Sequence, residues 1–387
     1  MPRNSNRIPA LDGVRGIAIL MVLSFHWIFA SLPGWHSPDL TLSQNIIRHI
    51  FMLNWIGVDL FFVLSGFLIG GIILDNGKYS NFYSVFYVRR ACRILPLYIV
   101  LLLTLAMASA LLPWREDTAL YALLHPISVW PHLLFIQNLV PASGNIWTGN
   151  TWSLAIEEQF YILSPFLLLS CPKRFVPHAL CAGILISVAC RLGMLIYFGS
   201  AAGLMIYPLT FCRMDTLLIG ILAAWAIRDE YWSKVIADNM RIVRWTVLMM
   251  VAVLVGFIIK RWSGYELPMA SFGYTWVAAM CAGFIMIAYY DQPAFLSWNV
   301  LRLFGRWAYS MYLFHRPLGA LIFWIVLGRQ QSIADPVGIL VTAICLAALV
   351  GVAAAAWRWI EAPIIQAGHR FRYGPRIRVS PVLSPSS

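Results

Sequence analysis

Ten apolar stretches, most of them close to twenty residues long, recur along the whole chain. An α-helix needs about twenty apolar residues to cross a bilayer, and unbroken runs are not the alternating pattern of a membrane β-barrel. Hydrophobic residues make up 60% of the chain and charged residues 11%, which excludes a soluble globular domain. We therefore predict an all-α, polytopic membrane protein with spans at residues 10–31, 46–74, 94–112, 152–171, 177–198, 205–227, 243–261, 269–290, 303–327 and 337–360.

One further apolar stretch is interrupted by prolines. Residues 120–140 contain Pro126 and Pro131, so we expect an interfacial or re-entrant piece and not an eleventh crossing. We predict a single membrane domain over residues 1–361, followed by a basic cytoplasmic tail over residues 362–387 that is disordered after Arg378.

The distribution of basic residues predicts the orientation of the spans. With the N-terminus in the cytoplasm, 20 of the 28 Lys and Arg residues lie on the inner side, 5 on the outer side and 3 within spans. This bias predicts a multi-pass protein of the cytoplasmic (inner) membrane with both termini inside. The net charge of +12 then reflects topology and contact with the lipid bilayer, and we expect no nucleic-acid partner. The seven cysteines show no metal-ligand or disulfide spacing, so we expect no bound metal.

The first span carries two ionisable groups that a purely lipid-facing helix would not need. Arg15 lies at its cytoplasmic start, and His26 lies eleven residues further on. Eleven residues make nearly three turns and about 16 Å, so the two side chains share one helix face at different depths. A titratable group at membrane depth is costly and usually functional, although an anchoring arginine and a histidine bonded to a carbonyl would give the same pattern.

Other ionisable residues interrupt the later spans. Glu157 enters from the outer end of its span, so we expect it to meet His26 as a carboxylate meets the imidazole of a general base. Arg213 and Asp215 are two positions apart, so each needs another partner, and we favour a structural role for them. Four residues are candidates for lining an internal cavity: Asp59, Trp152, Arg213 and His315.

Arginines also gather at the start of the third span. Arg90 and Arg93 are three positions apart and share a helix face. Cytoplasmic anchoring alone would explain them, but guanidinium groups at this spacing also suit phosphate oxygens. A phosphate-bearing ligand in the cytoplasm would find them at the level of Arg15.

These pieces together resemble acyltransferase family three, the membrane-bound O-acyltransferases that include O-antigen acetylases and nodulation-factor acetyltransferases. The matching segments are RIPALDGVRGIAIL, FFVLSGFLI, FYVRRACRILPLY, WSLAIEEQFYILSP, YSMYLFHRPL and WRWIEAP, which span nearly the whole chain. The family's Arg-x10-His motif falls on Arg15 and His26, and its Arg-x-x-Arg motif on Arg90 and Arg93. Its Trp-Ser-Leu…Glu segment runs from Trp152 to Glu157.

The resemblance implies transfer of an acyl group, usually acetyl, from cytoplasmic acyl-CoA to a sugar hydroxyl of a glycan or glycolipid. Arg15, Arg90 and Arg93 would bind the donor, and His26 with Glu157 would carry the catalysis. The family motif selects Glu157 over Glu158. His315, flanked by Arg316 and Pro317, is the competing base, but we expect it to be structural or cavity-lining. A transporter or flippase with a buried proton relay is the alternative reading of the same polar groups.

Overall fold

The computed structural model describes residues 8–31, 41, 43, 48, 50–111, 127–140, 145–259 and 267–375. Its regular elements in these ranges are helices: α1 (Pro9–Ser24), η1 (Phe25–Phe29), η2 (Leu53–Ile56), α3 (Gly57–Asn76), α4 (Phe82–Leu111), α6 (Val129–Leu133), α7 (Trp152–Ser170), η3 (Lys173–Phe175), α8 (Val176–Phe198), η4 (Gly199–Ala201), α9 (Ala202–Ile206), α10 (Thr210–Ala226), α11 (Glu230–Asp238), α12 (Met240–Ile259), η5 (Met269–Gly273), α13 (Tyr274–Tyr290), η6 (Ala294–Ser297), α14 (Asn299–Leu327), α15 (Pro336–Ala356), η7 (Trp357–Glu361) and α16 (Ala362–His369). Of these, η1, η5 and η7 are π-helical turns.

The all-α membrane architecture predicted from the sequence is confirmed. A helix lies on each of the ten predicted stretches, and seven helices of the described ranges are long and apolar enough to cross a membrane. An eighth is gained when the bent pair α10 and α11 counts as one span. The count of ten crossings stays a prediction. Helix α4, on the third predicted span, begins at Phe82, well before the predicted residue 94. Arg90 and Arg93 therefore lie within this helix.

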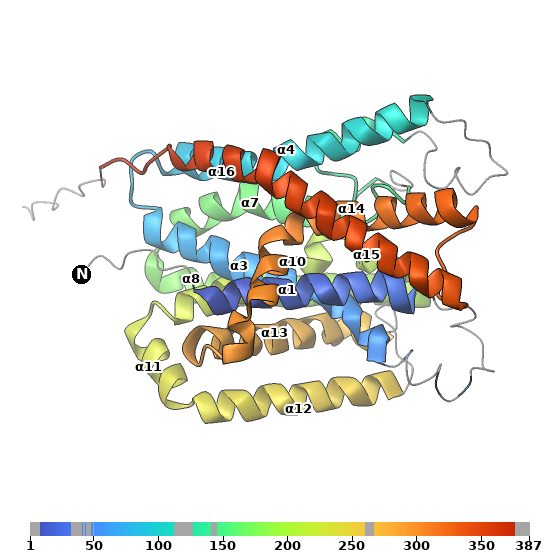
Figure 1. The fold of residues 1–387 in the computed structure, drawn as a ribbon. Helices are drawn as coiled ribbons and strands as arrows, with labels where there is room; N and C mark the ends of the chain where they lie inside the picture. The colour runs from blue at the N-terminus through green and yellow to red at the C-terminus, as the bar shows by residue number, and fades with distance from the viewer. Residues whose placement is uncertain are drawn as a thin grey trace, which may run out of the picture.

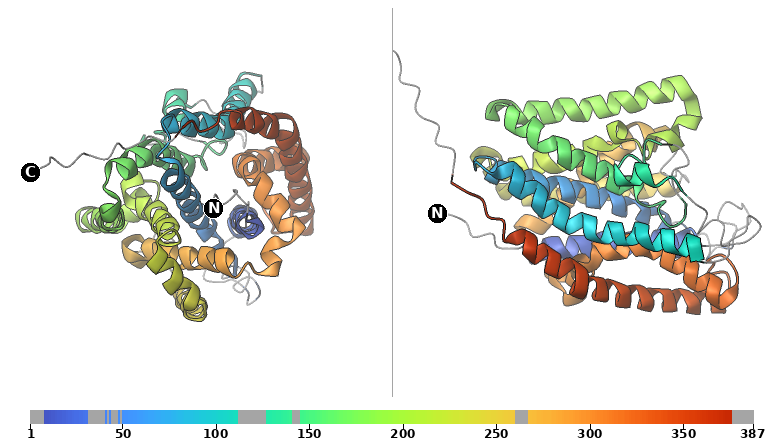
Figure 2. Two further views of the ribbon diagram at one scale, coloured as in Figure 1. Left: turned by 90° about the vertical axis from the view of Figure 1, so that its left-hand side faces the viewer. Right: turned by 90° about the horizontal axis from the view of Figure 1, so that it is seen from above.

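Two helices run through the middle of the bundle. Seen end-on, α1 and α3 are surrounded by the other long helices (Figure 2). Glycines let neighbouring backbones approach them closely, as is common between membrane helices. A Cβ atom on Gly305 of α14 would lie 1.9 Å from the carbonyl oxygen of Asp12, and one on Gly220 of α10 would lie 2.1 Å from that of Val63. These contacts fix the rotation and the register of α14 on α1 and of α10 on α3.

Both ends of the described chain lie at one end of the bundle, where α1 begins and α16 ends (Figure 1). We call this the terminal end and the opposite one the far end. This placement fits the predicted topology, whereas the side of the membrane that the terminal end faces stays a prediction. The chain runs without a break from η7 into α16, so position 361 is no structural boundary.

The segment after α16 folds back onto the start of α4. Ser80 donates a backbone hydrogen bond to Pro375, and Gly374 donates one to the side chain of Asn81. Arg89 donates to the carbonyl of Phe371 at 2.6 and 3.1 Å. Residues 370–375 of the predicted tail are therefore docked on the bundle. The disorder predicted after Arg378 falls outside the described residues.

The interrupted stretch is not a span within its described part, residues 127–140. It forms only the five-residue helix α6 and a series of turns. Its polar side chains are buried and bonded to the bundle: Gln137 donates to the backbone of Thr151 at 2.9 Å, and Asn138 donates to the backbone of Pro208 at 3.0 Å. These bonds satisfy polar groups that lipid would leave unpaired.

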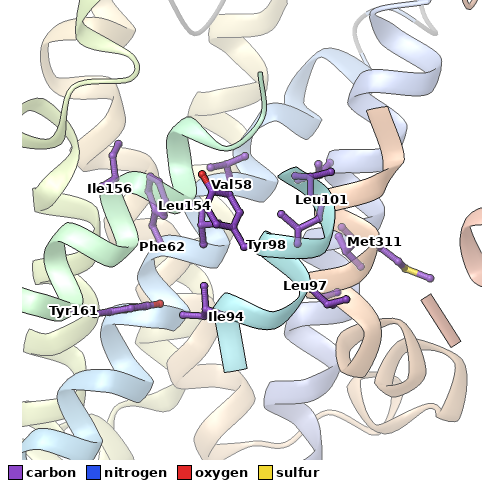
Figure 3. Packing of buried hydrophobic residues seen from close by; sticks show 14 of the residues in the cluster. Val58, Phe62, Ile94, Leu97, Tyr98, Leu101, Leu154, Ile156, Tyr161 and Met311 are labelled. Atoms are coloured by element: carbon purple, nitrogen blue, oxygen red, sulfur yellow. The ribbon is translucent and has the colours of Figure 1, made fainter. Parts of the chain in front are cut away.

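Apolar side chains of α4 close one side of the bundle. Ile94, Leu97, Tyr98 and Leu101 are buried and point toward α3, α7 and α14 (Figure 3). Arg90 and Arg93 lie just before this apolar stretch on the same helix.

Candidate functional site

A cavity that is partly open to solvent lies between the central helices and the start of α4. Five helices supply its lining: Arg15 of α1; Val58, Phe61, Phe62, Ser65, Leu68 and Ile69 of α3; Arg90, Arg93 and Ile94 of α4; Ser153, Leu154, Glu157 and Tyr161 of α7; Gly305, Ala308, Tyr309 and Tyr312 of α14.

Three arginines predicted to share one level do meet in this cavity. Arg15, Arg90 and Arg93 all line it, each only half-buried. Arg15 pairs with Asp12 at 3.0 Å, and the guanidinium of Arg90 lies 5.5 Å from the centre of the Tyr161 ring. Such a cluster, at a site partly open to solvent, is well suited to phosphate oxygens.

The neighbouring Arg89 points elsewhere. Its guanidinium lies over the ring of Tyr373, at 5.1 Å, and bonds the carbonyl of Phe371. Arg89 thus holds the docked segment 370–375, whereas Arg90, one position on, faces the cavity. Adjacent helix positions point about 100° apart, which separates the two roles.

Glu157 lies among the arginines, and the contact predicted with His26 is wrong. Its carboxylate accepts a hydrogen bond of 2.7 Å from Ser65. Gly57, at the start of α3, lies against Ala18 of α1, and Ser65 is two turns, about 12 Å, nearer the terminal end. Glu157 therefore lies with Arg15 at the cavity, nearer the terminal end than His26. The span ends predicted from the sequence were approximate, and they put Glu157 too near the far end.

His26 lies beyond the cavity, toward the far end, in the π-helical turn η1. Its Nδ1 is 3.0 Å from the carbonyl oxygen of Val22 and 3.3 Å from Nε2 of His315. Neither histidine lines the cavity, and Val22 does not line it either. The two histidines weighed as competing bases are instead neighbours. π-helical turns inside long helices are frequent at functional sites because they re-aim side chains.

Three of the four predicted cavity residues are used in packing. Asp59 and Arg213 form a fully buried ion pair at 2.5 Å, and Arg213 also lies 3.9 Å from the centre of the Tyr274 ring. Trp152 packs against Tyr207, with ring centroids 4.7 Å apart. None of the three lines the cavity described above, and their role in lining another internal cavity stays a prediction. The same holds for His315, which is fully buried.

The structural role predicted for Arg213 and Asp215 agrees with their partners. Asp215 pairs with Arg191 at 3.0 Å, and both side chains are fully buried. Arg191 further donates to the backbone of Ser271 at 2.8 Å. The two ion pairs thus tie α10 to α3 and to α8. A buried charge needs such a partner, and removing one leaves the other uncompensated.

Sequence reasoning missed several polar residues of the cavity. Ser153 and Tyr161 lie four positions on either side of Glu157, so one stripe of α7 carries all three. This spacing was visible in the sequence. Tyr309 and Tyr312, three apart on α14, form a second such stripe. Ser153 and Tyr312 are 2.5 Å apart at their hydroxyls.

The chain matches the model of the acyltransferase domain family over residues 8–357. It belongs to this acyltransferase family. It is 27% identical over 394 residues to the O-acetyltransferase OatA of Staphylococcus aureus strain NCTC 8325 / PS 47, and equally to OatA of strain COL. In both cases the match covers 95% of this chain and 59% of the relative. The chain thus spans about three-fifths of the length of these relatives. No solved structure matches it.

The family segments read from the sequence therefore rest on a confirmed relationship. The Arg-x10-His and Arg-x-x-Arg motifs, and the segment ending at Glu157, all fall within the matched range. In the structure, the two arginine motifs and the glutamate meet at the cavity, while the histidine stands beyond its far-end limit.

Proposed function

We propose that this protein is a membrane O-acyltransferase that moves an acyl group, in the simplest case acetyl, from acyl-CoA to a sugar hydroxyl. The observation that carries the proposal is the cavity, lined by five helices, in which Arg15, Arg90, Arg93 and Glu157 come together. Family membership and the relatives named O-acetyltransferase support the reaction class and favour acetyl.

The arginines would bind the donor. Acyl-CoA carries several phosphate groups at one end and the thioester at the other. Phosphates on Arg15, Arg90 and Arg93 would leave the pantetheine arm to follow the cavity past Ser65 and Ser153. Guanidinium groups bind phosphate oxygens with paired hydrogen bonds, so this end of the cavity suits the charged end of the donor. The positive-inside bias predicts that this end faces the cytoplasm, where acyl-CoA is made.

His26 would act on the acceptor. The acceptor oxygen bonds to the thioester carbonyl carbon and the carbon–sulfur bond breaks. The hydroxyl proton passes to the imidazole and then to the departing sulfur. A transient acyl-histidine at the same residue is the other route, and trapping an acylated His26 by rapid quench and mass spectrometry separates the two. Glu157, at the donor level, would act on the donor end through Ser65 and the arginines.

The acceptor would be a surface glycan, a lipid-linked glycan or a lipophilic glycoside that reaches the far end of the bundle in the inner membrane. His26 lies toward this end, and the predicted topology places it outside the cytoplasm. The chain would therefore separate donor and acceptor across the membrane and let them meet between the cavity and His26.

The test uses the full chain purified in lipid nanodiscs with radiolabelled acetyl-CoA and candidate glycan acceptors. Label should appear on the acceptor, and free CoA should be released in equal amount. His26→Ala should bind acetyl-CoA as the wild type does and transfer no label. Movement of a glycan or of protons across proteoliposomes without acyl transfer would instead favour the transporter. Mass spectrometry of surface glycans from a deletion strain identifies the acyl group by the mass that is lost.

A further inference from the structure

The two histidines that lie beyond the cavity touch each other. His26 comes from η1 and His315 from α14, with ring centroids 4.9 Å apart. Nε2 of His315 lies 3.3 Å from Nδ1 of His26. His315 is fully buried, while His26 keeps some exposure. The first helix and the ninth predicted span therefore meet at this pair.

Backbone carbonyls decide which ring nitrogens carry protons. Nδ1 of His26 lies 3.0 Å from the oxygen of Val22, and Nδ1 of His315 lies 2.8 Å from the oxygen of Tyr312. A carbonyl oxygen only accepts, so each Nδ1 must donate. The reverse tautomers would place two lone pairs against each other at both positions. The hydrogen-bond network therefore assigns an Nδ1–H to each neutral ring.

This assignment gives each Nε2 a defined role. Nε2 of His315 carries a lone pair and faces Nδ1–H of His26. This N–H therefore has two acceptors, the carbonyl oxygen of Val22 and Nε2 of His315. Nε2 of His26 is left with a lone pair as well and is the basic atom of the pair. A base whose other nitrogen is held by a fixed acceptor has a defined tautomer and ring orientation.

We infer that His315 is a positioning residue for His26, an inference that rests on the function proposed above. His315 holds the His26 ring against α14 with Nε2 free to receive the acceptor's hydroxyl proton. When that proton arrives, His26 becomes an imidazolium whose Nδ1–H donates more strongly to Nε2 of His315. His315 needs to accept no proton itself, and the proton on Nε2 of His26 goes on to the CoA sulfur. The two histidines thus act as one unit.

Tyr312 links this unit to the donor cavity. Its carbonyl accepts from Nδ1 of His315 and from the side chain of Asn150. Its side chain lines the cavity, and its hydroxyl donates to the carbonyl of Asn150 at 2.9 Å. His315, which accepts from His26, thus lies one turn of α14 beyond Tyr312 at the far-end wall of the cavity.

The kinetic test compares three substitutions of His315 in the full chain. The side-chain amide of His315→Gln reaches the place of Nε2, so its oxygen can accept from His26. His315→Asn places its amide near Nδ1 and loses that contact, as does His315→Ala. We expect Asn and Ala to lower kcat by about 100-fold, the lower end of a general-base contribution, with KM for acetyl-CoA unchanged. Gln should recover much of the loss. Equal rates for Gln, Asn and wild type, or a loss confined to KM, would overturn the assignment.

A second measurement needs no turnover and keeps the inference testable if a variant fails to fold. Nitrogen-15 NMR of the histidine-labelled wild type in nanodiscs reports the protonated ring nitrogen of each of the eight histidines. His26→Ala and His315→Gln assign the two signals. We expect Nδ1–H on both rings, and a shift of the His315 Nε2 signal when His26 is removed. A proton on Nε2 of either ring refutes the inference. If the wild type shows both tautomers as expected but transfers no acyl group, the proposed function is refuted and the tautomer assignment stands.

Discussion

Replacing Arg90 or Arg93 with alanine should weaken the binding of acyl-CoA and leave the fold intact. Both guanidinium groups line the cavity from one face of α4 and are only half-buried, so they contribute little to the packing of the core. Lysine at either position restores the charge without the planar pair of donors. We therefore expect lysine to recover affinity only in part.

The size of the effect follows from the contacts that are lost. A hydrogen bond to a charged group contributes about 1.5–3 kcal/mol, and about 1.4 kcal/mol corresponds to a tenfold change in affinity. Each alanine substitution should thus raise the Kd for acetyl-CoA by about 10- to 150-fold. The effects of the two substitutions on Kd need not add in the double variant, because Arg90 and Arg93 bind the same ligand.

Arg89 provides the matched control. Its substitution removes the same charge from the next position, but its guanidinium bonds Phe371 and lies over Tyr373. Isothermal titration of purified protein with acetyl-CoA should show little change for Arg89→Ala. If Arg89→Ala weakens binding as much as Arg90→Ala, then net charge and not cavity geometry sets the affinity. If neither cavity arginine matters, they are topology anchors only.

Three further outcomes test the site and the bundle. Glu157→Gln should abolish acyl transfer and Glu158→Gln should be milder, because only Glu157 lines the cavity; the opposite order in a turnover assay would remove Glu157 from the site. Gly220→Ala forces a Cβ to 2.1 Å from a carbonyl of α3 and should lower the thermal midpoint by overpacking worth about 1–3 kcal/mol, whereas Gly351→Ala has open space and should not. Arg213→Ala leaves its buried carboxylate partner uncompensated, at a cost of about 3–5 kcal/mol, and an unchanged midpoint would contradict the buried pair.

Some of the site could be read from local spacing. Arg90 and Arg93 share a face because they are three positions apart, and their place near Arg15 followed from the predicted topology. Both predictions depend on helix periodicity and on depth, which a single sequence carries. The stripe of Ser153, Glu157 and Tyr161 was equally visible.

Other parts of the site depended on how helices face each other. Glu157 was predicted to meet His26, but it bonds Ser65. The error arose because depth was counted from approximate span ends, and a shift of a few residues moves a side chain by a full turn. His26 and His315 were treated as alternatives because nothing in the sequence states that η1 and α14 adjoin.

By itself the sequence determined the class of protein, the helical stretches and the arginines that share a face, because these follow from composition and from the 3.6-residue period. The family segments came from their resemblance to a known family. Only the tertiary structure decided which faces meet. The close glycine contacts of Gly305 and Gly220 set rotation and register, and the π-helical turn changes the direction of His26 within its own helix. Pairings such as His26 with His315 and Asp59 with Arg213 join residues more than 150 positions apart. They arise from packing between helices, which the periodicity of each helix alone does not specify.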